Sequence, residues 1–171
     1  MNLIVAVDNN WCIGSQGNLL FSIPEDMQYF KKLTETKVVI MGHSTLKSLP
    51  HGKPLKNRTN IILSRNKDLN IDNAVVCHSV AELLSLIGTY NADDVFVIGG
   101  QMIYELLLDY CHAAYVTKIN AQGNGDTWFP NIDNRDNWEL ADESEEKQYN
   151  DITYRFTKYL NKKVLQETHG C

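Results

Sequence analysis

Short apolar runs alternate with segments of helical periodicity along most of the chain, and this alternation constrains the fold more than any other feature. The runs cover residues 2–7, 38–41, 60–64, 74–77, 94–98 and 113–120. Continuous runs rich in Val, Ile and Leu are typical of strands that are buried on both faces. Because helical segments separate these runs, the pattern predicts a single α/β domain with a mostly parallel sheet and helices on both faces.

Local sequence patterns indicate where several predicted elements begin and end. Ser22-Ile-Pro-Glu25 and Ser79-Val-Ala-Glu82 both have the pattern of a capping box, which predicts that a helix begins at each of them. Residues 152–157 alternate between apolar and polar, which predicts a half-exposed antiparallel strand at the edge of the sheet. The polar stretch before that strand, through Gln148, contains no predicted element. Residues 164–171 show no period, so the domain is expected to span 1–163 and to be followed by a tail or an expression remnant.

Charge and composition exclude several classes of protein. Lys and Arg number 16 against 21 Asp and Glu, and the net charge of -5 leaves no large basic face for nucleic acid. No apolar run approaches the ~18–20 residues of a membrane span, and the N-terminal run is too short for a signal peptide. The four cysteines lack Cys-x-x-Cys spacing, so no metal site is predicted, and scattered thiols favour the reducing cytoplasm.

Two junctions between a predicted strand and the following helix are rich in glycine, at residues 38–45 and 97–102. Each junction can aim free backbone N–H groups at a point past the end of its strand, which is an anion site. For either junction alone, a simple tight turn remains an open interpretation. The pair together favours a dinucleotide, although neither junction matches the Rossmann or the Walker glycine motif.

Several polar residues remain ambiguous from the residues alone. Asp26 lies four residues before Phe30, so both share one face of the predicted helix. This acid either stays in solvent at the positive end of the helix or binds a ligand, and both interpretations stay open. Arg58 and Arg65 flank a strand, and from the residues alone the solvated surface cation is the favoured interpretation of both. Thr117 is compatible with ordinary β-propensity.

Taken together, these pieces resemble the dihydrofolate reductase family of the short bacterial kind, from about Asn2 to Leu160. Each motif is weak alone, but their joint order and spacing is highly specific. The motifs are Leu3-Ile-Val-Ala6, Ile13-Gly14, Ile23-Pro-Glu-Asp-Met-x-Tyr-Phe-Lys31, Val39-Ile-Met-Gly42 with Thr45, Pro54-Leu-Lys-Asn-Arg58, Asn60-Ile-Ile-Leu-Ser-Arg65, Val97-Ile-Gly-Gly100 with Ile103-Tyr104, Thr117, and Gly125-Asp126-Thr-x-Phe-Pro130.

The resemblance implies a fold and a reaction. The fold is an eight-stranded, mostly parallel sheet with flanking helices and no metal. The reaction is the NADPH-dependent reduction of 7,8-dihydrofolate to 5,6,7,8-tetrahydrofolate, which supplies one-carbon metabolism. It transfers a hydride from nicotinamide C4 to pterin C6 and protonates N5. The implied partners are small molecules, namely dihydrofolate and antifolate inhibitors, and a monomer is expected.

The resemblance also implies roles for individual residues on the substrate side. Asp26 matches the family's buried acid, which hydrogen-bonds N3 and the 2-amino group of the pterin. Thr117 matches the hydroxyl that supports this carboxylate, and Phe21 occupies a third catalytic position. Arg58 matches the residue that binds the glutamate α-carboxylate, for which bidentate geometry suits Arg. The other substrate-binding positions are matched by Val5, Ala6, Met27, Phe30, Lys31, Leu49, Leu55, Ile98 and Tyr104.

On the NADPH side, the resemblance assigns both glycine-rich junctions to the phosphates and makes the Gly99–Gly100 peptide cis. Ser64 and Arg65 match residues that bind the 2′-phosphate, and residues 8–23 match a mobile loop that covers the nicotinamide. Gly125 and Asp126 match the segment that supports this loop from outside. The implied cofactor-binding positions are Ala6, Ile13, Gly14, Gly17, Asn18, Leu19, Gly42, His43, Ser44, Thr45, Leu63, Ser64, Arg65, Ile98, Gly99, Gly100, Gln101, Met102, Ile103 and Tyr104.

Two departures from the family pattern affect these expectations. Leu20-Phe21 replaces the usual Pro-Trp, whose indole N–H helps to hold a water near the pterin, and Phe has no such donor. His43 occupies a position where many relatives have Arg, and this difference affects how strongly the 2′-phosphate is bound.

Two alternative functions remain open from the sequence. One is a reductase of the same fold from riboflavin synthesis, against which Arg58 argues because that substrate has no glutamate tail. The other is a non-catalytic nucleotide or folate carrier. NADPH oxidation on adding dihydrofolate separates these alternatives from the leading interpretation.

Overall fold

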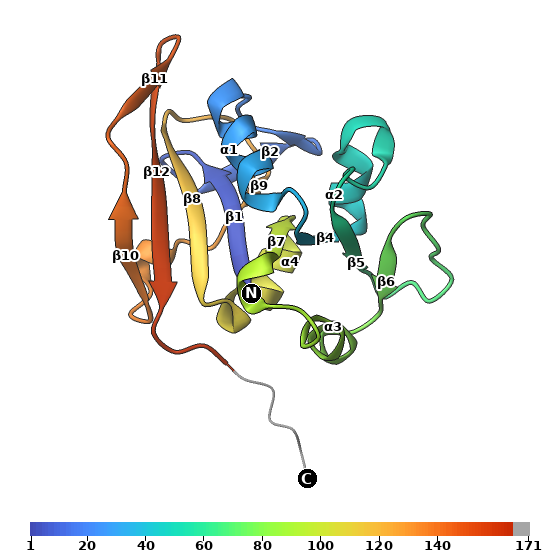
Figure 1. The fold of residues 1–171 in the computed structure, drawn as a ribbon. Helices are drawn as coiled ribbons and strands as arrows, with labels where there is room; N and C mark the ends of the chain where they lie inside the picture. Colours follow the sequence, from blue (N-terminus) through green and yellow to red (C-terminus); the bar gives the residue numbers. More distant parts are fainter. Residues whose placement is uncertain (166–171) are drawn as a thin grey trace.

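The computed structural model describes residues 1–165. Within this range a large sheet has the strand order β10-β12-β8-β1-β7-β4-β5-β6, and β11 pairs with β12 (Figure 1). Its strands are β1 (Asn2–Val7), β4 (Val38–Gly42), β5 (Thr59–Leu63), β6 (Val75–Cys77), β7 (Val95–Gly99), β8 (Ala113–Asn120), β10 (Trp138–Glu143), β11 (Lys147–Tyr149) and β12 (Ile152–Asn161). A small second sheet contains β2 (Cys12–Ser15), β3 (Asn18–Leu19) and β9 (Thr127–Trp128).

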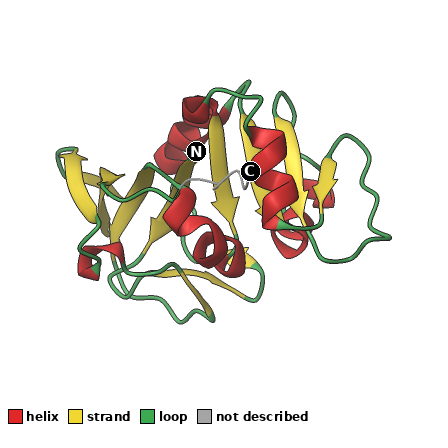
Figure 2. Cartoon of the chain, turned by 90° about the horizontal axis from the view of Figure 1, so that it is seen from below, coloured by secondary structure: helices red, strands yellow, loops and turns green. Residues whose placement is uncertain are grey.

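Helices lie on both faces of the large sheet (Figure 2). They are α1 (Pro24–Thr34), α2 (His43–Ser48), α3 (Val80–Ile87) and α4 (Gln101–Leu107), with short 3-10 helices at Pro50–Gly52, Ala92–Asp94, Leu108–Tyr110 and Ile132–Asn134. The predicted α/β fold with a mostly parallel sheet is confirmed. The six apolar runs predicted as strands correspond to β1, β4, β5, β6, β7 and β8, with ends that shift by at most one residue.

The antiparallel end of the sheet differs from the prediction in two respects. β12 pairs antiparallel with β8 as expected, but β10 and β11 pair with its other side, so β12 is not an edge strand. β10 and β11 fall in the polar stretch where no element was predicted. After Trp138, every residue of β10 is exposed. A strand that buries no face needs no alternation of apolar and polar residues, so periodicity does not reveal it. Backbone hydrogen bonds to β12 hold β10 in the sheet.

One of the two predicted capping boxes is confirmed and the other is wrong. At α3, the Glu82 backbone N–H donates to Ser79 Oγ (3.1 Å), and the His78 backbone N–H donates to Glu82 Oε2 (2.7 Å). At α1, the N-cap is Ile23, and it makes no side-chain cap hydrogen bond. Proline in the first turn explains this start, because Pro fits there without a donor.

The sheet is buried on both faces, which explains why its central strands are continuous apolar runs. One face packs around residues such as Leu3, Ile40 and Leu107, and the other around Met41 and Ile62. Full burial of each such side chain contributes roughly 1.5–3 kcal/mol. This core fixes the strand ends, and the residues that follow those ends are available for a site.

The end of the described chain remains attached to the domain. The backbone N–H of Leu165 donates to the Asp109 carbonyl at 2.8 Å. Residues 166–171, most of the predicted tail, lie outside the described residues. No helix within residues 1–165 combines the length and the apolarity that a membrane crossing requires.

Candidate active site

The two glycine-rich junctions lie against each other at neighbouring strand ends. A Cβ added to Gly100 would lie 3.1 Å from Thr45 Oγ1, and one added to Gly42 would lie 3.0 Å from Ile103 Cγ1. Gly99 has a φ of +124°, which side-chain-bearing residues rarely adopt, and the Gly99–Gly100 peptide is cis. The two junctions therefore lie together in the structure, as predicted.

Asp26 and Thr117 form the polar centre of the site. Thr117, on β8, is buried and donates from Oγ1 to Asp26 Oδ1 at 2.6 Å. Burial raises the pKa of the Asp26 carboxyl, and the Thr117 hydrogen bond partly opposes that rise because it favours the charged form. A partly buried carboxyl with a raised pKa has the character of an acid–base group.

An apolar cluster joins the start of α1 to β8 and β12. Ile23, Ile119 and Tyr154 form a buried cluster, and Ala6 and Phe21 pack against it. Phe21 therefore packs against the cluster that contains Ile119, two positions after Thr117 on β8. This placement brings the three residues predicted to be catalytic into one region.

The other predicted substrate residues divide into three groups by exposure. Leu49, Leu55 and Ile98 are partly buried against a separate core cluster on β4 and β5. On α1, Met27 and Lys31 are exposed and Phe30 is half-buried, so these side chains are accessible to a ligand. The remaining two are part of the packed interior, and they are Val5 and Tyr104. The Tyr104 hydroxyl donates to the Ile4 carbonyl at 2.7 Å, and burial raises its pKa.

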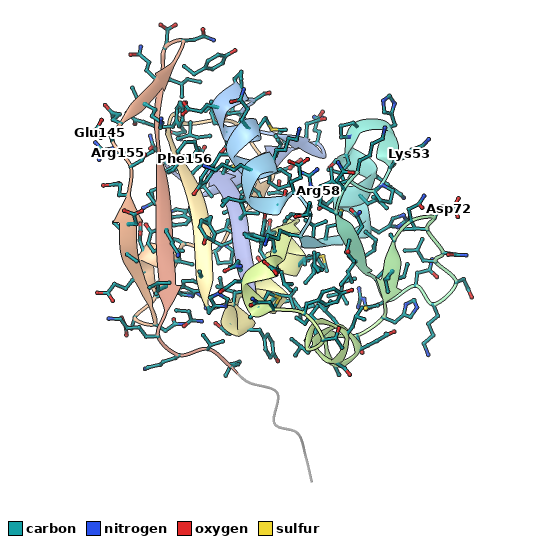
Figure 3. All side chains as sticks on the ribbon, in the orientation of Figure 1. Lys53, Arg58, Asp72, Glu145, Arg155 and Phe156 are labelled. Atoms are coloured by element: carbon teal, nitrogen blue, oxygen red, sulfur yellow. The ribbon has the colours of Figure 1, made fainter. Side chains whose placement is uncertain are left out.

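Arg58 is fixed at the C-terminal end of α1, in the view of Figure 3 on the side of that helix that faces α2. Its Nη2 donates to Thr34 Oγ1 (3.2 Å) and its Nη1 donates to the Lys56 carbonyl (2.8 Å). Thr34 was not singled out from the sequence, because a Thr in the last turn of a helix carries no distinctive signal. The anchored, half-buried guanidinium is suited to a carboxylate at the outer end of the site.

The long connection 8–23 is more ordered than the predicted loop, because it contains β2 and β3. Its outer support is the segment that was expected: the Gln16 backbone N–H donates to Asp126 Oδ2 (2.9 Å), and the Asp126 N–H donates to the Gly14 carbonyl (3.0 Å). Gly125 allows this close approach, since a Cβ there would lie 2.1 Å from Cys12 Sγ.

Other predicted cofactor positions in this connection and in α4 are accessible. The exposed ones are Gly17, Asn18 and Leu19 in the connection and Met102 in α4, and Ile13 is half-buried. Gln101 instead makes contacts within the protein. Its Oε1 accepts from the Trp128 backbone N–H (2.9 Å), and its Nε2 donates to Glu105 (2.9 Å). The sequence did not indicate this connection between α4 and β9.

The predicted 2′-phosphate residues lie at the ends of β4 and β5. Ser64 and Arg65 directly follow β5, and His43, which with Ser44 begins α2, follows β4. His78 follows β6, and its Nδ1 lies 3.0 Å from the Ser64 carbonyl oxygen. His78 was not singled out from the sequence, although its position after an apolar run parallels that of Ser64 after Leu63.

Comparisons with known proteins agree with this arrangement. The family described as dihydrofolate reductase matches residues 1–161. Proteins named dihydrofolate reductase from Staphylococcus aureus and Bacillus subtilis are 33% identical over 165 residues and 34% identical over 164 residues. Each alignment covers 95% of this chain, with 99% of the first relative and 95% of the second.

A solved structure is also similar over nearly its whole length. It is described as dihydrofolate reductase from Enterococcus faecalis complexed with NADP(H) and RAB-propyl. The TM-score is 0.84 at 30% identity, over 94% of this chain and 95% of that chain. On the family match and on these full-length relatives, the chain belongs to the dihydrofolate reductase family.

Proposed function

We propose that this protein reduces 7,8-dihydrofolate to 5,6,7,8-tetrahydrofolate with NADPH. Family membership, relatives named for this activity and an NADP(H)-bound structural neighbour support the proposal. The observation that carries it is the hydrogen bond between Thr117 and the half-buried Asp26 at the open end of the parallel sheet. In such sheets, ligands bind beyond the carboxyl ends of the strands.

The chain's residues fit a dinucleotide at the glycine-rich junctions. Glycine at 42 and 100 lets the two junctions pack closely against Ile103 and Thr45, and the backbone N–H groups at the starts of α2 and α4 would bind the phosphates. Bound NADPH supplies the hydride that passes from its nicotinamide C4 to pterin C6. The β2–β3 segment, held from outside by Asp126, limits the access of water to the reacting atoms.

Asp26 orients the pterin and holds the proton in this proposal. Its carboxylate accepts from N3–H and from the 2-amino group of the ring, while Thr117 keeps the carboxylate in place. Because burial raises the pKa of Asp26, the proton-bearing form of the acid–substrate pair persists toward neutral pH. The rate is then expected to fall as the pH rises above the raised pKa.

The residues around Asp26 complete the substrate site. Arg58, anchored on Thr34, binds the glutamate α-carboxylate, and an antifolate with an equivalent ring would compete for Asp26. Phe21 packs against Ile23, Ile119 and Tyr154 and has no hydrogen-bond donor, so solvent that enters past the β2–β3 segment delivers the N5 proton.

The proposal extends to the state of the protein. All the groups of the proposed site come from one chain, so a monomer can form the complete site. The monomer consists of one domain over residues 1–163. Cys12, Cys77 and Cys111 are free and buried, which suits a reducing compartment such as the cytoplasm.

The decisive experiment follows NADPH oxidation after dihydrofolate is added to the purified protein. Turnover of NADPH with formation of tetrahydrofolate is the expected result. Binding of both ligands without oxidation would establish a carrier instead, and turnover only with a riboflavin precursor would establish the other reductase. Asp72→Asn, an exposed acid on the loop between β5 and β6, is the control that should turn over like the wild type.

A further inference from the structure

One exposed residue in the segment before β9 lies between two anchored neighbours. On one side, the Gly123 backbone N–H donates to Oδ2 of the buried Asp8 at 3.0 Å. On the other side, the Asp126 backbone N–H donates to the Gly14 carbonyl at 3.0 Å. Asn124 lies between these two anchors, and its side chain is exposed to solvent.

The residue that follows Asn124 makes its side-chain amide chemically vulnerable. Asn124-Gly125 is the one Asn-Gly pair in the sequence. In such a pair the backbone nitrogen of the glycine can attack the side-chain amide carbon, because no Cβ crowds the approach. Neither residue belongs to a helix or a strand, and no hydrogen bond within residues 1–165 holds the Gly125 N–H or the Asn124 amide. The attacking group and its target are therefore free of competing hydrogen bonds.

We propose that Asn124 is a site of spontaneous deamidation, and that the isoaspartate formed there releases the contact between the β2–β3 segment and the segment before β9. In the first step, the Gly125 backbone nitrogen gives up its proton and forms a bond to Cγ of Asn124. The Cγ–Nδ2 bond breaks, the side-chain nitrogen takes up the proton and leaves as ammonia, and a five-membered succinimide remains. Water then opens this ring at either carbonyl, which gives aspartate or isoaspartate.

The packing of the segment explains why isoaspartate is disruptive. Isoaspartate carries the main chain through its side-chain carbons, which adds one atom to the backbone between the two anchors. Gly125 cannot absorb this atom, because a Cβ there would already lie 2.1 Å from Cys12 Sγ. One of the anchors, at Asp8 or at Gly14, must therefore open. The new carboxylate also adds a negative charge close to Asp126 in the sequence, and like charges repel.

The test of the modification incubates the purified protein at mildly alkaline pH and maps its peptides by mass spectrometry. Deamidation is expected first at Asn124, with isoaspartate among the products. Asn73 is the internal control, because it is also exposed but is followed by Ala74, which has a Cβ and whose N–H donates to the Ile71 carbonyl (3.3 Å). Equal rates of deamidation at Asn73 and Asn124 would overturn the proposal.

Hydrogen exchange measures the release of the segment without reference to activity. In the deamidated protein, the backbone N–H groups of Gln16 and Asp126 should exchange up to about 10-fold faster, the scale of one lost hydrogen bond. The N–H of Glu82 on α3, far from β2 in Figure 1, should exchange as before. Unchanged exchange at Gln16 and Asp126 in the deamidated protein would refute the release.

Two variants at the same position separate the added backbone atom from the added charge. Asn124→Gln should show neither modification nor release, because its longer side chain would have to close a less favoured six-membered ring. Freshly purified Asn124→Asp carries the charge without the extra backbone atom, so it should keep the exchange rates of the wild type. Faster exchange in this fresh variant would assign the release to charge and exclude the role of isoaspartate.

The chemistry at Asn124 is independent of the proposed function, but its effect on turnover rests on that function. NADPH oxidation with dihydrofolate should decline in proportion to the isoaspartate fraction in the wild type, and it should stay constant in incubated Asn124→Gln. If fresh wild type is active and its isoaspartate form keeps full activity, this part of the inference fails and the proposed function stands. If fresh wild type does not oxidise NADPH, the proposed function is wrong, while hydrogen exchange still tests the release.

Discussion

Thr117 Oγ1 and Asp26 Oδ1 are 2.6 Å apart, although the two residues are separated by 91 positions in the chain. The bond joins the first turn of α1 to the middle of β8. It acts against burial: burial favours the neutral carboxyl of Asp26, whereas the hydroxyl favours the carboxylate. The balance between these two effects sets the pH range in which the acid can work.

The first prediction concerns the acid itself. Asp26→Asn should lower turnover at pH 7 by roughly 100-fold or more, the scale of a lost acid–base group, which corresponds to about 2.7 kcal/mol of barrier. The deficit should shrink in acid, where solvent can protonate the substrate. Steady-state rates against pH check this, and a neutral-pH rate equal to that of the wild type would remove Asp26 from the mechanism.

Removing the hydroxyl should move the pH profile rather than abolish the reaction. Thr117→Val deletes the bond that holds the pKa of Asp26 down, so the pKa rises further and the decline in rate shifts to higher pH. Thr157→Val is the matched control, because its buried hydroxyl donates to the Val116 carbonyl and not to Asp26. Equal profiles for the two variants would contradict the prediction.

Asp26 should also make the protein less stable at neutral pH. Its pKa is raised in the folded state above the ordinary value of about 3.9. The folded protein therefore binds more protons between these two values, and the free energy of unfolding falls as the pH rises through them. Asp26→Asn removes this cost, so its Tm should exceed that of the wild type at pH 7 and converge with it in acid. Each kcal/mol raises the Tm by roughly 2–4 °C at this size.

Asp133→Asn is a control for the stability measurement, because its expected change in Tm at pH 7 has the opposite sign. Burial would raise the pKa of Asp133, but hydrogen bonds from Lys118 and Tyr159 outweigh it and lower the pKa. Its stabilisation is present at neutral pH and is lost as the pH falls through the lowered pKa. This variant should therefore be less stable than the wild type at pH 7. If both variants shift the Tm in the same direction, the assignment for Asp26 fails.

Cofactor preference should depend on the exposed guanidinium after β5. Arg65→Ala should weaken NADPH binding by about 10- to 150-fold, the range for a charge-assisted hydrogen bond, and leave NADH binding unchanged. Lys67→Ala, at an exposed cation two positions further along, is the comparison. Equal affinity of the wild type for NADPH and NADH would contradict the prediction and would indicate that His43 grips the phosphate weakly.

The last prediction restores a donor beside the pterin. Phe21→Trp should raise the hydride-transfer rate, and more so at high pH, because an indole N–H can hold a proton-delivering water. One hydrogen bond is worth ~0.5–1.5 kcal/mol, while overpacking of the half-buried site can cost ~1–3 kcal/mol. Single-turnover rates against pH separate these effects. A uniform slowing at every pH would mean that packing dominates.

The sequence predicted the elements whose signal is local. Strands such as β1 and β8 have apolar runs that the core requires, and Ser79 caps α3 with its own neighbours. The prediction failed where a distant partner decides the structure. β10 is exposed and charged, and it is a strand only because β12 pairs with it.

The same distinction holds for the site. The glycine-rich junctions and Asp26 were found because their residue types and spacing matched a known pattern. Thr34 and His78 were not singled out, because no periodicity encodes their contacts with Arg58 and Ser64. Glu25 did not complete the predicted cap at Ser22, because its carboxylate accepts from Lys147 and Tyr154 instead.

That last contact has a consequence for synthesis of the protein on the ribosome. Glu25 precedes Asp26, and its partners lie 122 and 129 residues further along the chain, on β11 and β12. The helix that carries the acid emerges early, but the strands that anchor it are among the last to be made. A nascent chain that ends before β11 therefore lacks both partners of Glu25, so the connection between α1 and the antiparallel end of the sheet can form only when translation is nearly complete.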